Sequence, residues 1–189
     1  MTQRPIKVML ADDHEVVRTA LAAVIDRQPD LAVIAQAADG HEVCDRVPSL
    51  SPHVLLLDIV MPVLGGIEAA RWIREKHPRT EVVILTGYHN EAYQRQAFEA
   101  GARGYLEKTC SIEDLLLAIR HAARGDYFLA GPSGRDVVAE WVRPAVRRQQ
   151  PGGVVTQRER ELAILLADGY STKEAAAVLG ISTKTAETH

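Results

Sequence analysis

Five short apolar runs alternate with amphipathic segments over the first two thirds of the chain, and this alternation limits the fold more than any other feature. Between the runs, apolar residues recur at the three- and four-residue spacing of a helix, as in 112–119. Strands that alternate with helices form a parallel sheet with helices on both faces. The sequence therefore predicts an α/β fold, a flavodoxin-like, doubly wound parallel sheet of five strand–helix units. The predicted strands are 7–11, 31–37, 54–58, 81–86 and 104–108.

The third run, VLLLD, raises a specific question because an acid follows four apolar residues. Inner strands of a parallel sheet are buried on both faces, so they appear in sequence as unbroken apolar runs. VLLL fits such a central strand, and Asp58 then stands at its carboxyl end. A buried strand holds a carboxylate rigidly, which indicates a chemical use for Asp58.

Composition is that of a globular protein with a sizeable core. Of the 189 residues, 47% are apolar and 25% are charged. No stretch approaches the roughly 20 apolar residues of a membrane span, and the first residues do not resemble a signal peptide. We therefore expect a cytoplasmic protein without membrane contacts. The two cysteines have no metal-type spacing, so neither a disulfide framework nor a zinc site is predicted.

The pattern changes after residue 125. Glycine and proline interrupt residues 125–134, and 143–153 is polar, which is typical of a linker. From residue 154 onward no strand pattern is visible. The predicted organisation is a domain at 5–125, a linker at 126–153 and a small all-α segment at 154–189.

The last segment shows three helix starts. Thr156 and Ser171 are each followed three residues later by glutamate, which is the spacing of a capping box, and Ser182 can cap a third helix. Residues 126–189 hold eight basic and eight acidic side chains. DNA binding therefore cannot be inferred from the charge of this half and must be argued from its motif.

Polar residues stand at the carboxyl ends of four predicted strands: Asp12 and Asp13, Asp58, Thr86 and Lys108. These ends share one edge of a parallel sheet, which is where ligands bind. Crowded carboxylates need a hard cation, and Mg²⁺ accepts one or two carboxylates together with waters and a phosphoryl oxygen. A lysine and a hydroxyl supply further contacts to a phosphoryl group.

Each of these residues also has a simpler explanation. A single aspartate after a strand often caps a turn. Thr86 alone is a good strand residue, and Lys108 alone is a solvated charge. Their joint occurrence at four strand ends favours a phosphoryl and Mg²⁺ site.

With these residues in these positions, the segment from residue 5 to about residue 125 resembles the receiver domain of bacterial two-component response regulators. The resemblance rests on the motifs ADDH, LLLDIVMPVLGG, ILTGY and GARGYLEK. It implies that Asp58 accepts a phosphoryl group from a sensor histidine kinase. It also implies that Asp13 binds Mg²⁺ directly, that Asp12 binds it through water, and that the backbone carbonyl of Val60 is a further ligand. Lys108 and Thr86 would hold the phosphoryl oxygens.

The resemblance also implies a switch. Thr86 would move toward the phosphoryl group and Tyr105 would turn inward behind it, which reshapes the face of the fourth helix, fifth strand and fifth helix. The alternative is that Tyr105 only packs. Thr109 stands where many receivers have proline, so the family's cis peptide becomes costlier here. Val60 and Tyr88 form a bulky pair that we expect to slow hydrolysis of the phosphoryl group.

The segment VTQRERELAILLADGYSTKEAAAVLGISTKTAETH resembles the LuxR-type helix-turn-helix, so the whole chain resembles the NarL/FixJ class of response regulators. The resemblance implies that the helix beginning at Ser182 enters the major groove. Because the chain given ends at His189, we expect an incomplete recognition helix and weak DNA binding. The candidate DNA contacts are Thr172, Lys173, Lys184, Glu187 and Thr188.

The function predicted is that of a phosphorylation-dependent transcriptional regulator with a histidine kinase, double-stranded DNA and Mg²⁺ as partners, and a homodimer when phosphorylated. It would be no enzyme beyond self-catalysed phosphorylation and dephosphorylation. One alternative is a receiver that acts through protein partners without binding DNA. Another is a Mg²⁺-dependent phosphatase that uses an aspartyl phosphate, but no assisting acid or cap domain follows Asp58.

Overall fold

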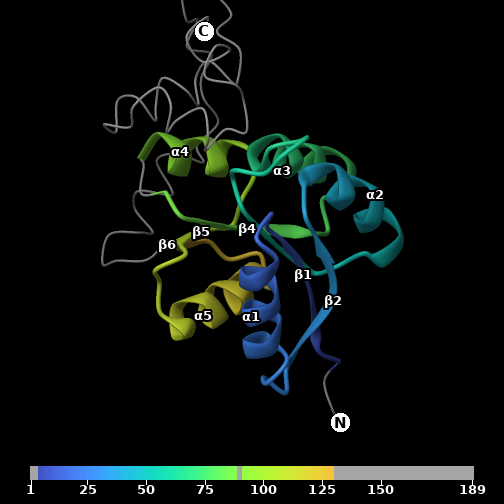
Figure 1. Ribbon diagram of the computed structural model, residues 1–189, viewed down its shortest axis with the longest axis vertical. Helices are drawn as coiled ribbons and strands as arrows, with labels where there is room; N and C mark the ends of the chain where they lie inside the picture. The colour runs from blue at the N-terminus through green and yellow to red at the C-terminus, as the bar shows by residue number, and fades with distance from the viewer. Residues whose placement is uncertain (1–3, 89–90, 130–189) are drawn as a thin grey trace, which may run out of the picture. The chain divides into compact units, whose positions relative to one another are not determined.

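Figure 1 shows the computed structural model of the chain, which describes residues 4–88 and 91–129. This part of the chain alternates strands and helices as the apolar runs predict. The strands are β1 (Ile6–Ala11), β2 (Leu31–Ala37), β3 (Val54–Leu57), β4 (Glu81–Thr86), β5 (Gly104–Glu107) and β6 (Phe128–Leu129). The helices are α1 (Glu15–Ile25), α2 (Gly40–Leu50), α3 (Gly66–Lys76), α4 (Glu91–Glu99) and α5 (Ile112–Ala122).

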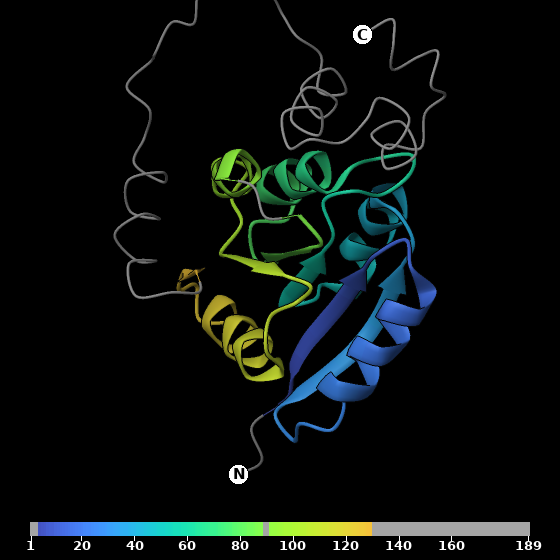
Figure 2. The same ribbon diagram turned by 60° about the vertical axis from the view of Figure 1, so that its left-hand side comes forward.

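All six strands form one sheet in the order β2-β1-β3-β4-β5-β6, and every neighbouring pair is parallel. Figures 1 and 2 show α1 and α5 on one face of the sheet and α2, α3 and α4 on the other. The fold is therefore the predicted flavodoxin-like, doubly wound arrangement. The order reverses at β1 and β3, which is the place where such sheets bind ligands.

The core explains why β3 lies at the centre. All four residues of β3 are buried. Val54 and Leu56 belong to a core cluster with residues of α1 and α5, and strand alternation turns Leu55 and Leu57 to the other face of the sheet. In the register of the sheet, Leu57 pairs with Ala11 on one side and with Ile84 on the other. The residues that follow β1 and β3 are thereby brought together at one edge.

The strand β6 was not predicted. Its pairing with β5 begins with the Phe128 amide, which donates to the Arg103 carbonyl at 2.7 Å. β6 contains only two residues, which is too short to give a recognisable apolar run. This edge strand therefore gives no signal in the sequence, and it lies in the segment predicted as linker.

The chain divides into two units, Met1–Pro144 and Ala145–His189. The predicted helix-turn-helix and its five candidate DNA contacts lie outside the described residues, and the predicted domain boundaries stay a prediction. In the part of the chain that the structure describes, no helix is both long and apolar enough to cross a membrane.

Candidate functional site

Two buried carboxylates lie side by side at the carboxyl edge of the sheet. Asp12 follows β1 and Asp58 follows β3, directly after the paired residues Ala11 and Leu57. The Asp58 amide donates to the Ala11 carbonyl at 2.8 Å, and the Asp12 amide donates to the Ala37 carbonyl at 3.2 Å. Only 3% of Asp12 and 4% of Asp58 is exposed. The strands thus hold both acids in place and largely out of water.

Lys108 bridges these two acids. Its amide donates to the Thr86 carbonyl at 2.7 Å, which fixes the start of the loop after β5. Its Nζ atom lies 2.7 Å from Oδ2 of Asp12 and 2.7 Å from Oδ2 of Asp58. The peptide bond to Thr109 is trans, like every peptide bond in the described residues. One ammonium group therefore faces two carboxylates.

The pKa values of this pair reflect burial and mutual charge. Burial raises the pKa of the Asp58 carboxyl, the Lys108 ammonium opposes that rise, and the charge of Asp12 adds to it. The resulting pKa of Asp58 is above its ordinary value. Burial works against the charge of Lys108, but Asp58 and Asp12 together raise the pKa of its ammonium. Lys108 therefore stays charged, and Asp58 depends on it for ionisation.

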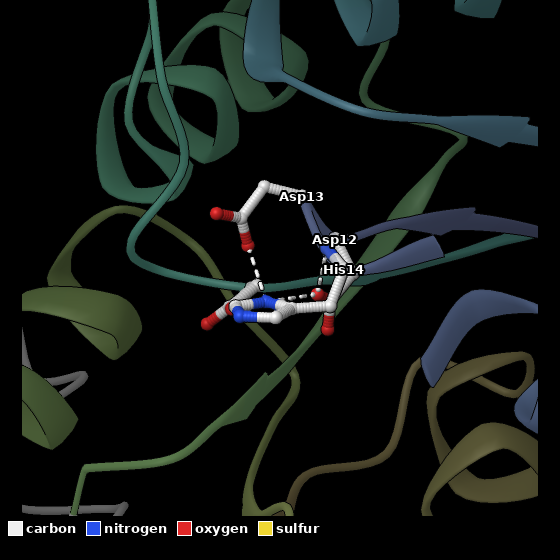
Figure 3. Close-up of side chains that lie close together, drawn as sticks. Asp12, Asp13 and His14 are labelled. Carbon is white, nitrogen blue, oxygen red and sulfur yellow. Dashed lines mark hydrogen bonds and ion pairs between the residues drawn. The ribbon is translucent and has the colours of Figure 1, made fainter. Parts of the chain in front are cut away.

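Four side chains bring candidate metal ligands within 4.8 Å of one another: Asp12, Asp13, His14 and Asp58. Figure 3 shows the His14 ring lying against the first two carboxylates, with its Nδ1 atom 2.7 Å from Oδ1 of Asp13 and 3.2 Å from Oδ1 of Asp12. Three carboxylates suit a hard cation such as Mg²⁺, whereas a single exposed imidazole is a ligand for softer metals. The donor set fits Mg²⁺. His14 was not among the predicted site residues, although it directly follows the acid pair in ADDH.

The loop between β3 and α3 is held by two glycines. A Cβ atom on Gly66 would lie 1.9 Å from the Asp58 carbonyl oxygen, and one on Gly40 would lie 2.5 Å from the Leu64 carbonyl oxygen. Their amides donate to the carbonyls of Ile59 and Leu64, at 2.8 and 3.1 Å. This loop carries Val60, the proposed backbone ligand.

The predicted switch residues form a chain of hydrogen bonds. The Tyr88 amide donates to the Thr86 hydroxyl at 3.4 Å, and the Tyr105 hydroxyl donates to the Tyr88 carbonyl at 2.8 Å. Thr86 is fully buried and Tyr105 is 2% exposed. Burial raises the pKa of the Tyr105 hydroxyl, and the charges of Glu107 and Asp58 raise it further, so the hydroxyl keeps its proton. Tyr105 therefore lies inward in this structure, and its movement stays a prediction.

The fold and this edge together define a class of protein: a receiver-type signalling domain with an acidic pocket and a bridging lysine. Comparison with known families agrees. The model of the response regulator receiver domain matches residues 8–120, and that of the luxR family of bacterial regulatory proteins matches residues 154–189. The chain belongs to the two-component response regulators, and it combines a receiver with a LuxR-type DNA-binding domain as a phosphorylation-dependent transcription regulator. The predicted family and function are confirmed.

Individual relatives support the same assignment. The oxygen regulatory protein NreC of Staphylococcus aureus (strain bovine RF122 / ET3-1) is 36% identical, over 97% of this chain and 87% of the relative. A LuxR-family response regulator from Aurantimonas sp. SI85-9A1 is 34% identical, with a TM-score of 0.66 over 72% of this chain and 96% of that one. The response regulator ChrA of a heme-sensing two-component system is 35% identical, with a TM-score of 0.59 over 99% and 87% of the two chains.

Proposed function

We propose that Asp58 is the residue that accepts a phosphoryl group from a sensor histidine kinase, with Mg²⁺ held by Asp12, Asp13, Asp58 and the Val60 carbonyl. The observation that carries this proposal is the bridge of Lys108 to two buried carboxylates, at 2.7 Å each. Of the three acids, Asp58 directly follows the central strand β3, whose backbone is paired with β1 on one side and with β4 on the other.

The chemistry is an in-line transfer to an oxygen of Asp58. The carboxylate oxygen forms a bond to phosphorus while the P–N bond of the kinase phosphohistidine breaks, and the electron pair of that bond stays on the imidazole nitrogen. Bound Mg²⁺ supplies positive charge to the carboxylates and to the phosphoryl oxygens. Lys108 keeps Asp58 ionised despite its burial, because its ammonium opposes the rise in the carboxyl pKa.

Lys108 and Thr86 are proposed to hold the phosphoryl oxygens. The Thr86 hydroxyl accepts from the Tyr88 amide, which leaves its own proton for a phosphoryl oxygen. Such a bond would draw Thr86 toward Asp58 and bias the arrangement of Tyr88 and Tyr105 behind it. Phosphorylation is thereby proposed to reach the face of α4, β5 and α5.

The output is proposed to be dimer formation and binding of double-stranded DNA through residues 154–189. The candidate contacts are Thr172, Lys173, Lys184, Glu187 and Thr188. The luxR-family match favours this output over a receiver that acts through protein partners alone. Beyond self-catalysed phosphorylation and dephosphorylation, no turnover of small substrates is proposed.

Intact mass spectrometry tests the acceptor. With phosphoramidate and Mg²⁺, the wild type should gain one phosphoryl group, and Asp58→Asn should gain none. Asp45→Asn serves as the matched control, because Asp45 is an exposed acid on α2 whose side chain is 69% accessible. Phosphorylation of the Asp58→Asn variant at another residue would contradict the assignment.

A further inference from the structure

A second basic residue, Arg18, lies beside the acid pair and plays no part in the function proposed so far. It belongs to the first turn of α1, and its Nη1 atom donates to the backbone carbonyl of Asp12. Arg18, Asp12 and Asp58 line one small pocket at the edge of the sheet. The other lining residues are Leu10, Ala11, Leu21, Leu56, Leu57 and Leu85.

The guanidinium of Arg18 has few interactions that offset its removal from water. Within residues 4–88 and 91–129, its Nε atom is buried without a hydrogen-bond partner, and no carboxylate forms an ion pair with it. A charged group that is partly removed from water and forms no direct ion pair is costly. An apolar side chain at this position would pack α1 against the sheet at a lower cost. The contact of Arg18 with Asp12 therefore needs a separate explanation.

The hydrogen bond from Arg18 to the Asp12 carbonyl holds the backbone that carries Asp12 and Asp13. The Asp12 amide is held by the Ala37 carbonyl at 3.2 Å, and the Asp12 carbonyl is held by Arg18. That carbonyl belongs to the peptide group that joins Asp12 to Asp13, so fixing it fixes the direction in which Asp13 leaves the sheet. Asp13 stands in the loop, and 36% of its side chain is exposed.

We propose that Arg18 is a positioning residue, which holds the β1–α1 loop so that Asp12 and Asp13 present their carboxylates to the cation. The inference rests on the proposed function, because it assumes that these acids bind Mg²⁺. It assigns to Arg18 no contact with the phosphoryl group or with the cation.

The direction in which Mg²⁺ affinity changes when Arg18 is replaced distinguishes positioning from a purely electrostatic role. A positive charge beside the acids repels a cation, so its removal would tighten Mg²⁺ binding if charge alone mattered. Loss of a residue that orients metal ligands weakens metal binding by about 10- to 100-fold. A weaker affinity in an Arg18 variant therefore indicates positioning.

Calorimetric titration of Mg²⁺ without a phosphodonor gives the direct readout. Arg18→Ala should raise the Kd for Mg²⁺ about tenfold, and Arg18→Lys should recover part of the loss because an ammonium can still donate to the Asp12 carbonyl. With phosphoramidate, Arg18→Ala should shift the Mg²⁺ midpoint of phosphorylation to the same extent and leave the rate at saturating Mg²⁺ nearly unchanged.

The matched control is Arg120→Ala. Arg120 pairs with Asp30 at 2.7 Å, at the edge of the sheet where β1 begins, so its removal lowers stability without touching the acids. Its Kd for Mg²⁺ should equal that of the wild type. An Arg18→Ala variant with unchanged or tighter Mg²⁺ binding would overturn the inference, as would a lower maximal rate with an unchanged Kd.

The two proposals fail separately. If the wild type bound Mg²⁺ but gained no phosphoryl group, the acceptor role of Asp58 would be wrong, while the calorimetric comparison would still decide the role of Arg18. If Arg18→Ala did not fold, as judged by circular dichroism, Arg18→Lys and Arg18→Gln would be compared in its place.

Discussion

The Nζ atom of Lys108 lies 2.7 Å from Oδ2 of Asp58, fifty positions earlier in the chain. The two residues follow different strands, β5 and β3, with β4 between them. The contact therefore depends on the order of the strands and on the length of the lysine side chain. It joins a carboxyl whose pKa is raised by burial to the cation that opposes this rise.

Replacement of Lys108 by alanine should slow phosphorylation of Asp58. The variant loses the charge that favours the ionised carboxylate and one donor to the phosphoryl oxygens. We expect the rate at fixed Mg²⁺ and phosphoramidate to fall about 100-fold or more, as for loss of one donor to a developing oxyanion. Intact mass spectra over time give the rate. Lys76→Ala, at the exposed end of α3, is the control, and a Lys108→Ala rate within twofold of the wild type would refute the role.

The raised pKa of Asp58 predicts a dependence of stability on pH. The folded chain holds the Asp58 proton more tightly than the unfolded chain, so stability is lost as the pH rises from the ordinary value of 3.8 through the folded pKa. Asp58→Asn removes this cost and should raise the free energy of unfolding at pH 7. The gain should shrink as the pH approaches 3.8. Urea denaturation without Mg²⁺ at several pH values measures it, and a gain that grows toward low pH would contradict the assignment.

The close approach of Gly66 to the Asp58 backbone predicts that adding one methyl group at Gly66 lowers stability strongly. A Cβ atom at 1.9 Å from the Asp58 carbonyl oxygen forces the backbone of the β3–α3 loop to move. Gly66→Ala should therefore destabilise the fold by about 3 kcal/mol. Denaturant unfolding measures the loss. Gly87→Ala is the control, since its Cβ would meet nothing within 4 Å, and equal losses in the two variants would show that the contact is not the cause.

The sequence predicted β1 to β5 and the meeting of the acids because both follow from periodicity and parallel topology, whereas the two-residue strand β6 is too short to show a period. Asp12 directly follows a predicted strand, Asp58 and Lys108 end two others, and the ends of parallel strands share an edge. The contacts of His14 and Arg18 could not be predicted in this way. They depend on loop geometry and on the direction of individual side chains, which apolar patterns do not encode.

The hydrogen bond from the Tyr105 hydroxyl to the Tyr88 carbonyl predicts that two substitutions of Tyr105 lower stability by different amounts. Tyr105→Phe keeps the packed ring and loses only the bond to the Tyr88 carbonyl, so it should cost about 1 kcal/mol of stability. Tyr105→Ala also loses the buried ring and should cost about 3 to 5 kcal/mol. Both variants should still be phosphorylated at Asp58, since the Tyr105 hydroxyl bonds the Tyr88 carbonyl, whereas the Asp58 carboxylate is paired with Lys108. Denaturation and intact mass measure the two properties, and a phosphorylation defect in Tyr105→Phe would place the hydroxyl in the chemistry.

The edge strand β6 is expected to depend on the aromatic residue that precedes it. The Arg103 guanidinium lies 4.7 Å from the centre of the Tyr127 ring and bonds Glu81 at 2.8 Å, while the Arg103 carbonyl accepts from the Phe128 amide. Tyr127→Ala removes the cation–π contact, which contributes about 1 kcal/mol. Hydrogen exchange of the Phe128 amide should then accelerate about fivefold.

Tyr127→Phe retains a ring beneath the guanidinium and should leave the exchange of the Phe128 amide close to that of the wild type. The Asp58 amide, bonded to Ala11 at 2.8 Å in the middle of the sheet, reports on global stability and should not change. Equal acceleration at both amides would mean that Tyr127 stabilises the whole domain. A selective effect at Phe128 would show that β6 opens by itself. Its neighbour is β5, in which Tyr105 pairs with Leu129 of β6.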